Sequence, residues 1–183
     1  AGEVFKEGTY EIESERRGYA LELAVDFVRM EYTRHRFWEK DDTPVVPLKS
    51  QTLEDVIGTW PQGKINVRIG DYMFRPHQKW TITAVPDGGG YLGGPYYKIV
   101  IEGTNRALAA TADAEVVTVP EFTGAPEQLW RIDQLTDGTY RIIPKEVPGT
   151  DKELVLVSVG DSTPSLGEFD MNSDNSKWNF RDH

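Results

Sequence analysis

A short pattern occurs three times along this chain of 183 residues: a strand-like segment that opens with tyrosine, followed later by one that opens with tryptophan. The six segments are Tyr10-Glu-Ile12, Tyr97-Lys-Ile99, Tyr140-Arg-Ile142, Trp80-Thr-Ile82, Trp130-Arg-Ile132 and Trp178-Asn-Phe180. Successive tryptophans lie 50 and 48 residues apart, and two of them close Gln-x-Trp triplets, with Ser176 replacing the glutamine in the third. Such self-similarity is typical of repeat architectures, so the pattern favours a fold built from three similar units.

The segments between these aromatic residues predict β-structure. Short stretches of alternating or β-branched residues occur at 97–101, 115–119, 140–143 and 154–159. Such stretches are typical of strands, and Gly- and Pro-containing turn signals separate them. A β-sandwich has no reason to show threefold sequence symmetry. We therefore predict an all-β fold, a β-trefoil with pseudo-threefold symmetry.

The predicted fold is a single domain over residues 1–183, with lobes at about 1–86, 87–135 and 136–183. The first lobe is enlarged, because 70 residues separate its tyrosine from its tryptophan, against 33 and 38 in the other lobes. Part of the excess, Thr52 to Gly58, reads as a helical turn with Thr52 as N-cap and a terminating glycine. Long loops on a compact scaffold are often functional, although a loop without a role is the other interpretation.

The charge balance argues against anionic partners. The chain carries 20 basic and 30 acidic residues, a formal net charge of −10, which opposes binding to nucleic acid or to an anionic membrane surface. The excess is uneven, with a net charge of −2 over residues 1–80 and −8 over the rest. There is no cysteine, which excludes disulfides and a thiol nucleophile.

The chain shows no secretory leader and no apolar run long enough to span a membrane. We therefore expect a cytoplasmic protein without a membrane partner. A signal peptide already removed would leave little trace, so secretion stays open.

The Gln-x-Trp triplets resemble those of the ricin-B-type β-trefoil lectins, in which the triplets recur from lobe to lobe. The resemblance implies that each tryptophan is a core residue closing its lobe. It also implies that sugar binding needs a separate set: an aspartate near the second strand, an aromatic platform and a nearby amide side chain. In the third lobe Asp151, Phe169 and Asn175 occur in this order, which makes carbohydrate a candidate partner.

The whole chain also resembles the β-trefoil peptidase inhibitors of mushrooms, the cospin-like serine-protease inhibitors and the mycocypins. The likeness rests on Glu7-Gly-Thr-Tyr-Glu-Ile12, on Tyr97-Lys-Ile-Val-Ile-Glu-Gly103 and on Ala125-Pro-Glu-Gln-Leu-Trp-Arg-Ile132. It implies a fungal protein that inhibits a protease, of serine type, through an exposed loop. By this analogy the reactive-loop candidates lie in the first lobe: Arg34, Arg36, Phe37, Trp38 and Lys40.

The chemistry of these residues agrees with a reactive loop, but it also agrees with a second interpretation. A trypsin-like protease needs an arginine or lysine to meet the carboxylate in its specificity pocket, and aromatic residues anchor interfaces. The segment 29–40 has a local net charge of +2 in an acidic chain. The competing interpretation is an amphipathic strand with Arg34 and Arg36 on its solvent face and Phe37 and Trp38 packed inward.

Enzymatic activity has no support in the sequence. No Ser, His and Asp set is marked by its context, and adjacent acidic residues arise by chance among 30 carboxylates. The histidines at 35, 77 and 183 are too scattered for a metal site, so we expect neither a metal nor a cofactor. Three non-enzymatic functions remain: peptidase inhibition as first choice, a carbohydrate-binding lectin, and an interaction module with neither activity.

Overall fold

The computed structural model describes residues 5–16, 18–25, 52–91, 94–160 and 162–182. It contains twelve strands: β1 (Gly8–Ser14), β2 (Ala20–Leu23), β3 (Ile65–Gly70), β4 (Trp80–Tyr91), β5 (Gly94–Ile101), β6 (Ala107–Ala110), β7 (Val116–Val119), β8 (Trp130–Gln134), β9 (Tyr140–Pro144), β10 (Val155–Val159), β11 (Thr163–Gly167) and β12 (Trp178–Asp182). The described helices are α1 (Leu53–Ile57) and three 3-10 turns: η1 (Pro76–Gln78), η2 (Pro126–Gln128) and η3 (Asp174–Ser176).

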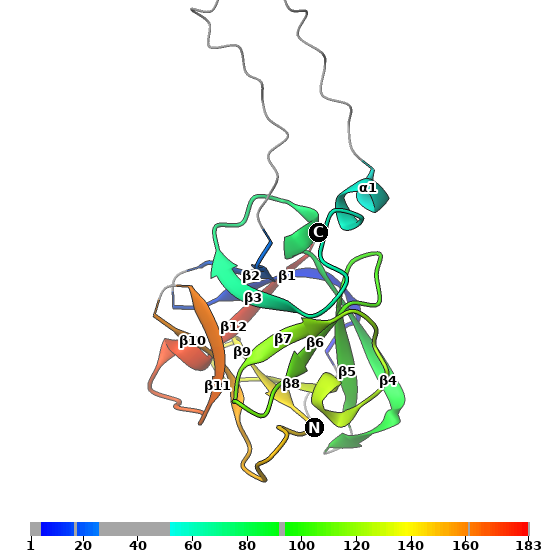
Figure 1. The fold of residues 1–183 in the computed structure, drawn as a ribbon. Coiled ribbons are helices and arrows are strands. Elements are labelled where there is room, and N and C mark those ends of the chain that lie inside the picture. The colour runs from blue at the N-terminus through cyan, green and yellow to red at the C-terminus, as the bar shows by residue number, and fades with distance from the viewer. Residues whose placement is uncertain (1–4, 17, 26–51, 92–93, 161, 183) are drawn as a thin grey trace, which may run out of the picture.

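Six strands form a closed antiparallel barrel in the order β1, β4, β5, β8, β9, β12 and back to β1. The other six form the hairpins β2–β3, β6–β7 and β10–β11, which contact one another through β3, β7 and β11 (Figure 1). Each lobe thus contributes four consecutive strands. Closure leaves the barrel without an open edge, and the predicted all-β trefoil is confirmed.

The three tryptophans make the same contact in each lobe. Trp80, Trp130 and Trp178 are fully buried. Each indole Nε1 donates a hydrogen bond of 2.9 Å to a leucine carbonyl in the second strand of its lobe: Leu21, Leu108 and Leu156. In each lobe, therefore, the same arrangement buries the indole ring and gives its N–H a hydrogen-bond acceptor. The expectation that these residues close the lobes is confirmed.

The first residue of each triplet holds the loop that precedes it. Gln78 Oε1 accepts the Met73 N–H at 2.8 Å, and Gln128 Oε1 accepts the Thr123 N–H at 2.7 Å. Ser176 is shorter and instead donates its hydroxyl to the Asp170 carbonyl at 3.3 Å. The triplets are thus part of the scaffold.

Phe5, which precedes β1, lies among the tyrosines that open the lobes. Its ring centroid is 5.3 Å from that of Tyr10, 5.8 Å from Tyr97 and 5.6 Å from Tyr140. The Tyr97 hydroxyl also donates a hydrogen bond of 3.0 Å to the Phe5 carbonyl. Because Phe5 contacts the equivalent residue of every lobe, it lies near the pseudo-threefold axis and joins the lobes together.

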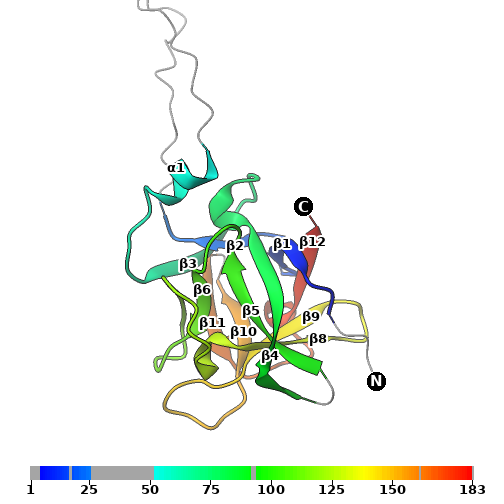
Figure 2. The same ribbon diagram turned by 90° about the vertical axis from the view of Figure 1, so that its right-hand side faces the viewer.

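The short helix α1 lies outside the barrel, at the side of the β2–β3 hairpin (Figure 1 and Figure 2). Thr52 Oγ1 accepts the Asp55 N–H at 3.1 Å, and Asp55 Oδ2 accepts the Thr52 N–H at 3.2 Å. This reciprocal pair is a capping box. The helical turn predicted from Thr52 to Gly58 is therefore confirmed, and it extends the first lobe.

Candidate functional site

One equivalent position differs in chemistry between the lobes. It directly follows the leucine whose carbonyl accepts the tryptophan hydrogen bond, and it holds Glu22 in the first lobe, Ala109 in the second and Val157 in the third. The Glu22 side chain is only 5% exposed. A carboxylate so deeply buried must be paired and hydrogen-bonded to remain charged.

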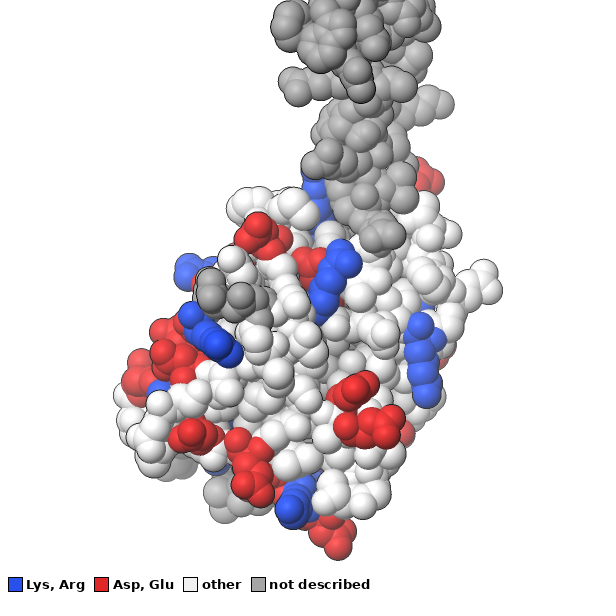
Figure 3. All heavy atoms as spheres, turned by 60° about the vertical axis from the view of Figure 1, so that its left-hand side comes forward, with Lys and Arg blue, Asp and Glu red and all other residues white. Residues whose placement is uncertain are grey.

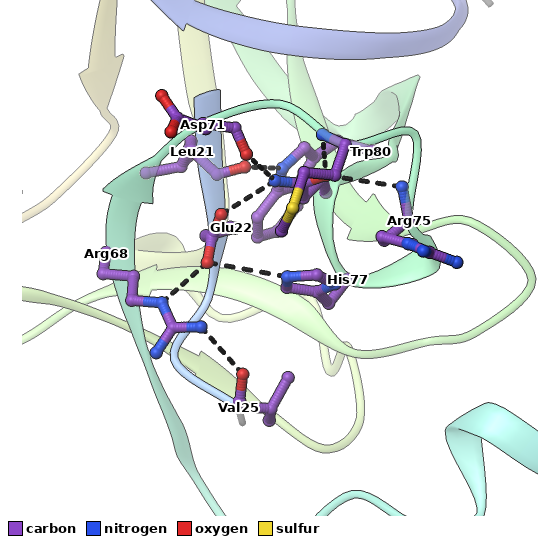
Figure 4. A network of polar contacts seen from close by, with 10 residues as sticks. Leu21, Glu22, Val25, Arg68, Asp71, Arg75, His77 and Trp80 are labelled. Carbon is purple, nitrogen blue, oxygen red and sulfur yellow. Dashed lines mark hydrogen bonds and ion pairs between the residues drawn. The ribbon is translucent and has the colours of Figure 1, made fainter. Parts of the chain in front are cut away.

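Three side chains supply these partners (Figure 4). Arg68 of β3 donates its Nε–H to Glu22 Oε2 at 2.6 Å, and Gln78 donates its Nε2–H to Glu22 Oε1 at 2.8 Å. His77 Nε2 lies 3.5 Å from Glu22 Oε2, which is ion-pair distance for a protonated imidazole. The carboxylate thus ties β2 to β3 and to the turn η1.

The balance of burial and hydrogen bonding sets the charge of Glu22. Burial raises the pKa of this carboxyl, but the hydrogen bonds from His77, Arg68 and Gln78 outweigh it and hold the pKa below its ordinary value. Arg68 also donates from Nη2 to the Val25 carbonyl at 2.8 Å. Because protein donors occupy both oxygens of Glu22, it positions the surrounding backbone and is not available to a ligand.

Through Gln78, Glu22 positions the loop from Asp71 to Arg75. Gln78 donates a second Nε2–H to the Asp71 carbonyl at 2.7 Å, and its Oε1 accepts the N–H groups of Met73 and Arg75 at 2.8 and 3.3 Å. One buried amide therefore binds the loop at three backbone points. A loop held in this way is pre-ordered for binding.

The apex of the loop presents one aromatic ring to solvent. Phe74 is 72% exposed, and its ring centroid lies 4.7 Å from that of Tyr72. Its backbone is left-handed, with a φ of 58°, whereas the equivalent position in the second lobe is Gly124 with a φ of 85°. A left-handed conformation costs a bulky residue roughly 1–2 kcal/mol that glycine does not pay. The exposed ring has no burial to offset this strain, which points to a role outside folding.

The same loop carries an exposed carboxylate, that of Asp71. Asp71 is exposed, and its side chain points away from the Glu22 network (Figure 4). Within the described part of the chain this carboxylate makes no hydrogen bond or ion pair. We call Asp71, Tyr72, Met73 and Phe74 the aromatic loop. An aromatic face stacks on apolar C–H groups, and a carboxylate accepts hydroxyl protons, so the loop carries the chemistry needed to hold a pyranose ring.

The reactive-loop candidates of the peptidase-inhibitor hypothesis, Arg34, Arg36, Phe37, Trp38 and Lys40, all lie outside the described residues. Their role stays a prediction.

The third-lobe sugar candidates lie in different environments. Asp151 is exposed and lines a groove of about 440 Å³ with Lys145 and Glu153. Phe169 packs against the small core cluster of β9 and β10, and the guanidinium of Arg141 lies 5.2 Å from its ring centroid. Asn175 Oδ1 accepts the Ser173 hydroxyl at 2.7 Å. Among the contacts that the structure describes, none joins these three residues, and their joint role stays a prediction.

On the face drawn in Figure 3, acidic and basic side chains are mixed, without a continuous basic area of the kind that nucleic acid requires. No three His, Cys, Asp or Glu residues in the described ranges are arranged to hold a metal. None of the described helices is long and apolar enough to cross a membrane.

Comparison with protein families gives one match. Residues 76–165, just under half of the chain, match a family described as ricin-type β-trefoil lectin domain-like. This segment contains both Gln-x-Trp triplets. No curated protein matches the chain.

Comparison with solved structures supports the fold. A mosquitocidal holotoxin aligns with a TM-score of 0.65 at 14% identity, over 98% of this chain and 18% of its own. The designed threefold-symmetric protein ThreeFoil aligns with a TM-score of 0.61 at 19% identity, over 96% of this chain and 99% of its own. A Polyporus squamosus lectin, bound to the epitope Neu5Aca2-6Galb1-4GlcNAc, aligns with a TM-score of 0.62 at 15% identity, over 98% of this chain and 50% of its own.

These identities are low enough that the likeness concerns the fold. This chain spans less than a fifth of the holotoxin and half of the lectin. The family match names a lectin domain. Neither this family nor these structures support the resemblance to the peptidase inhibitors found in mushrooms.

Sequence reasoning did not single out Glu22 or the aromatic loop. One signal was present: Tyr72-Met73-Phe74 places three large apolar residues in the segment between a strand and a triplet, where the second lobe has Phe122-Thr-Gly124. Turns are usually built from Gly, Pro, Asn, Asp and Ser, so three large apolar residues in a turn indicate a role other than forming the turn.

Proposed function

We propose that this chain is a carbohydrate-binding β-trefoil module whose sugar site is the aromatic loop of the first lobe. The observation that carries the proposal is Phe74, an exposed ring held in a left-handed backbone against Tyr72. Asp71 of the same loop is exposed and makes no side-chain hydrogen bond or ion pair among the described residues. The match of residues 76–165 to a lectin-domain family supports the same class of function.

The expected ligand is a neutral sugar. The exposed ring of Phe74, which packs against Tyr72, offers a face for the C–H side of a pyranose, and the Asp71 carboxylate accepts its hydroxyl protons. An acidic sugar is disfavoured at this loop because Asp71 would repel its carboxylate. The bonds of Gln78 to the loop backbone lower the entropic cost of binding.

Peptidase inhibition, the first choice from sequence alone, now takes second place. Its proposed loop lies outside the described residues, and the family match favours sugar binding. A panel of trypsin, chymotrypsin, subtilisin and papain tests it independently. Inhibition that is lost when Arg34 and Arg36 are both changed to alanine would restore it.

A glycan array followed by calorimetric titration of the best neutral glycan tests the proposal. Asp71→Asn should weaken binding at least tenfold, because hydrogen bonds to a charged group contribute about 1.5–3 kcal/mol. Asp151→Asn is the matched control, since it neutralises the exposed carboxylate of the third-lobe candidate site. Loss of binding in Asp151→Asn alone would move the site to the third lobe. An array without neutral binders would contradict the proposal.

A further inference from the structure

The barrel has three equivalent seams, where the last strand of one lobe pairs with the first strand of the next. They are β4–β5, β8–β9 and β12–β1. Core isoleucines, or phenylalanine in β12, alternate along these strands with residues that face outward. The outward pairs are therefore equivalent by position, and their chemistry can be compared seam by seam.

In two of the seams the outward-facing arginines form ion pairs with carboxylates. At β8–β9, Arg131 Nη2 pairs with Glu153 at 2.6 Å, and Asp133 pairs with both Arg131 and Arg141 at 2.9 and 3.2 Å. At β12–β1, Arg181 pairs with Glu13. Each of these cations therefore already has a carboxylate partner.

The side chains of the β4–β5 seam differ from these; its two strands are labelled in Figure 2. Thr83 lies opposite Lys98 and Thr81 opposite Val100. Lys98 Nζ lies 5.4 Å from the ring centroid of Phe122, but in the described part of the chain it makes no ion pair. The Thr83 hydroxyl, likewise, has no hydrogen-bond partner among the described residues. A cation and a free hydroxyl thus face outward from neighbouring strands.

These groups line a groove. Its volume is about 440 Å³, and its walls include Thr81, Thr83, Lys98, Thr104 and Asn105. None of the lining residues is acidic, in a protein with a net charge of −10. The neighbouring carboxylates of Glu121 and Glu7 are held by the Asn105 amide and the Ala84 N–H, at 3.3 and 3.2 Å.

The groove at the β8–β9 seam provides a contrast. It has the same volume, about 440 Å³, but Glu146, Asp151 and Glu153 line it together with basic residues. Lys145 there also lies over an aromatic ring, 5.2 Å from the centroid of Tyr96. The two grooves have equal volumes, but the β8–β9 groove sets three carboxylates beside its three basic residues, whereas Lys98 is the one charged residue among those that line the β4–β5 groove.

We infer that the β4–β5 groove is a second binding site, separate from the aromatic loop, for a small hydroxyl-bearing anion such as a uronic acid. The Lys98 ammonium donates charge-assisted hydrogen bonds to the carboxylate. The Thr83 hydroxyl and the remaining acceptor sites of Thr81 and Asn105 bind the sugar hydroxyls. A groove of this volume lies in the range of small-molecule sites, and a monosaccharide fits within it.

An NMR titration of the ¹⁵N-labelled chain tests this site, with glucuronate, glucose and inorganic sulfate as separate probes at equal ionic strength. Glucuronate should shift the backbone amides of Thr83, Lys98 and Asn105, and glucose should not. Lys98→Gln should weaken glucuronate binding about tenfold, and Thr83→Val, which keeps the side-chain shape, about fivefold. Lys145→Gln is the matched control and should leave the affinity unchanged.

The outcomes separate the possibilities. Absence of shifts with glucuronate, or equal affinity in the chain and in Lys98→Gln, overturns the site. An equal loss of glucuronate affinity in Lys145→Gln would show that the site does not lie in the β4–β5 groove. Sulfate shifts equal to those with glucuronate contradict the sugar part of the inference and leave a site for anions alone. Because neutral-glycan binding depends on Asp71 and not on Lys98, failure here is distinguishable from failure of the proposed function.

Discussion

The first and second lobes share the same scaffold contacts, and they differ in residues at positions where the lobe can close with either residue. Trp80 and Trp130 each donate to a leucine carbonyl at 2.9 Å, and Gln78 and Gln128 each hold the preceding loop. Yet Glu22 of the first lobe corresponds to Ala109, and the strained Phe74 corresponds to Gly124. The second lobe shows that a lobe closes without a buried carboxylate or an exposed ring, so both are additions to the fold.

The largest expected effect on stability concerns the tryptophan contact that the lobes share. Trp130→Ala should destabilise the chain by about 3–5 kcal/mol, because it leaves a cavity and removes the only side-chain partner shown for the Leu108 carbonyl. Urea unfolding measures the loss. Trp80→Ala and Trp178→Ala should cost similar amounts, since their contacts are the same. A change below 1 kcal/mol in one of them would break the equivalence of the lobes.

The contact that joins all lobes comes next. Phe5→Ala should cost about 2 kcal/mol, because the half-buried ring contacts Tyr10, Tyr97, Tyr140 and Phe180. The midpoint of urea unfolding reports it, and Phe5→Leu, which retains apolar bulk, should recover most of the loss. If Phe5→Ala unfolds at the midpoint of the unaltered chain, the segment before β1 does not join the lobes.

The buried carboxylate should have a smaller, pH-dependent effect. Glu22→Gln should cost about 1–3 kcal/mol at pH 7, because the side chains of Arg68 and His77 lose their anionic partner. The pKa of Glu22 is lower in the folded chain than in the unfolded chain, where it is about 4.3. The stabilisation is thus complete above that value and is lost as pH falls through the folded pKa. Unfolding of Glu22→Gln should respond less steeply to acid, and parallel pH profiles would contradict the network.

The difference at the loop apex should have the smallest effect on stability. Phe74→Gly restores the residue found at the equivalent place in the second lobe and removes the strain of a left-handed phenylalanine. The free energy of unfolding should stay the same or rise by up to about 1 kcal/mol. A loss above 1 kcal/mol in urea unfolding would show that the ring serves folding after all.

The fold was predictable because its determinants repeat. A tryptophan that must bury its ring and satisfy its N–H reaches the same solution in each lobe, so Trp80, Trp130 and Trp178 mark the architecture directly in the sequence. The capped turn at Thr52 was predictable for a similar reason, since a capping box involves residues three apart.

The candidate site was not predictable in this way. Glu22 meets Arg68 and Gln78 across 46 and 56 residues, a contact that depends on the register of β2 and β3. The exposure of Phe74 depends on the conformation of the loop, with a left-handed backbone at Phe74, which the triplet pattern does not encode. The placement of Asp151, Phe169 and Asn175 in different surroundings likewise depends on the packing of β9 and β10.

The central claim is that the first lobe departs from the repeat in order to bind sugar. The most direct measurement titrates the best neutral glycan into Phe74→Gly and into Met171→Ala, which removes an equally exposed apolar side chain, also 72% exposed, from the matching loop of the third lobe. Phe74→Gly should lose at least tenfold in affinity while remaining as stable as the unaltered chain, because covering one exposed phenylalanine ring from water contributes about 1.5 kcal/mol or more. Met171→Ala should bind as before. Unchanged affinity in Phe74→Gly would contradict the claim.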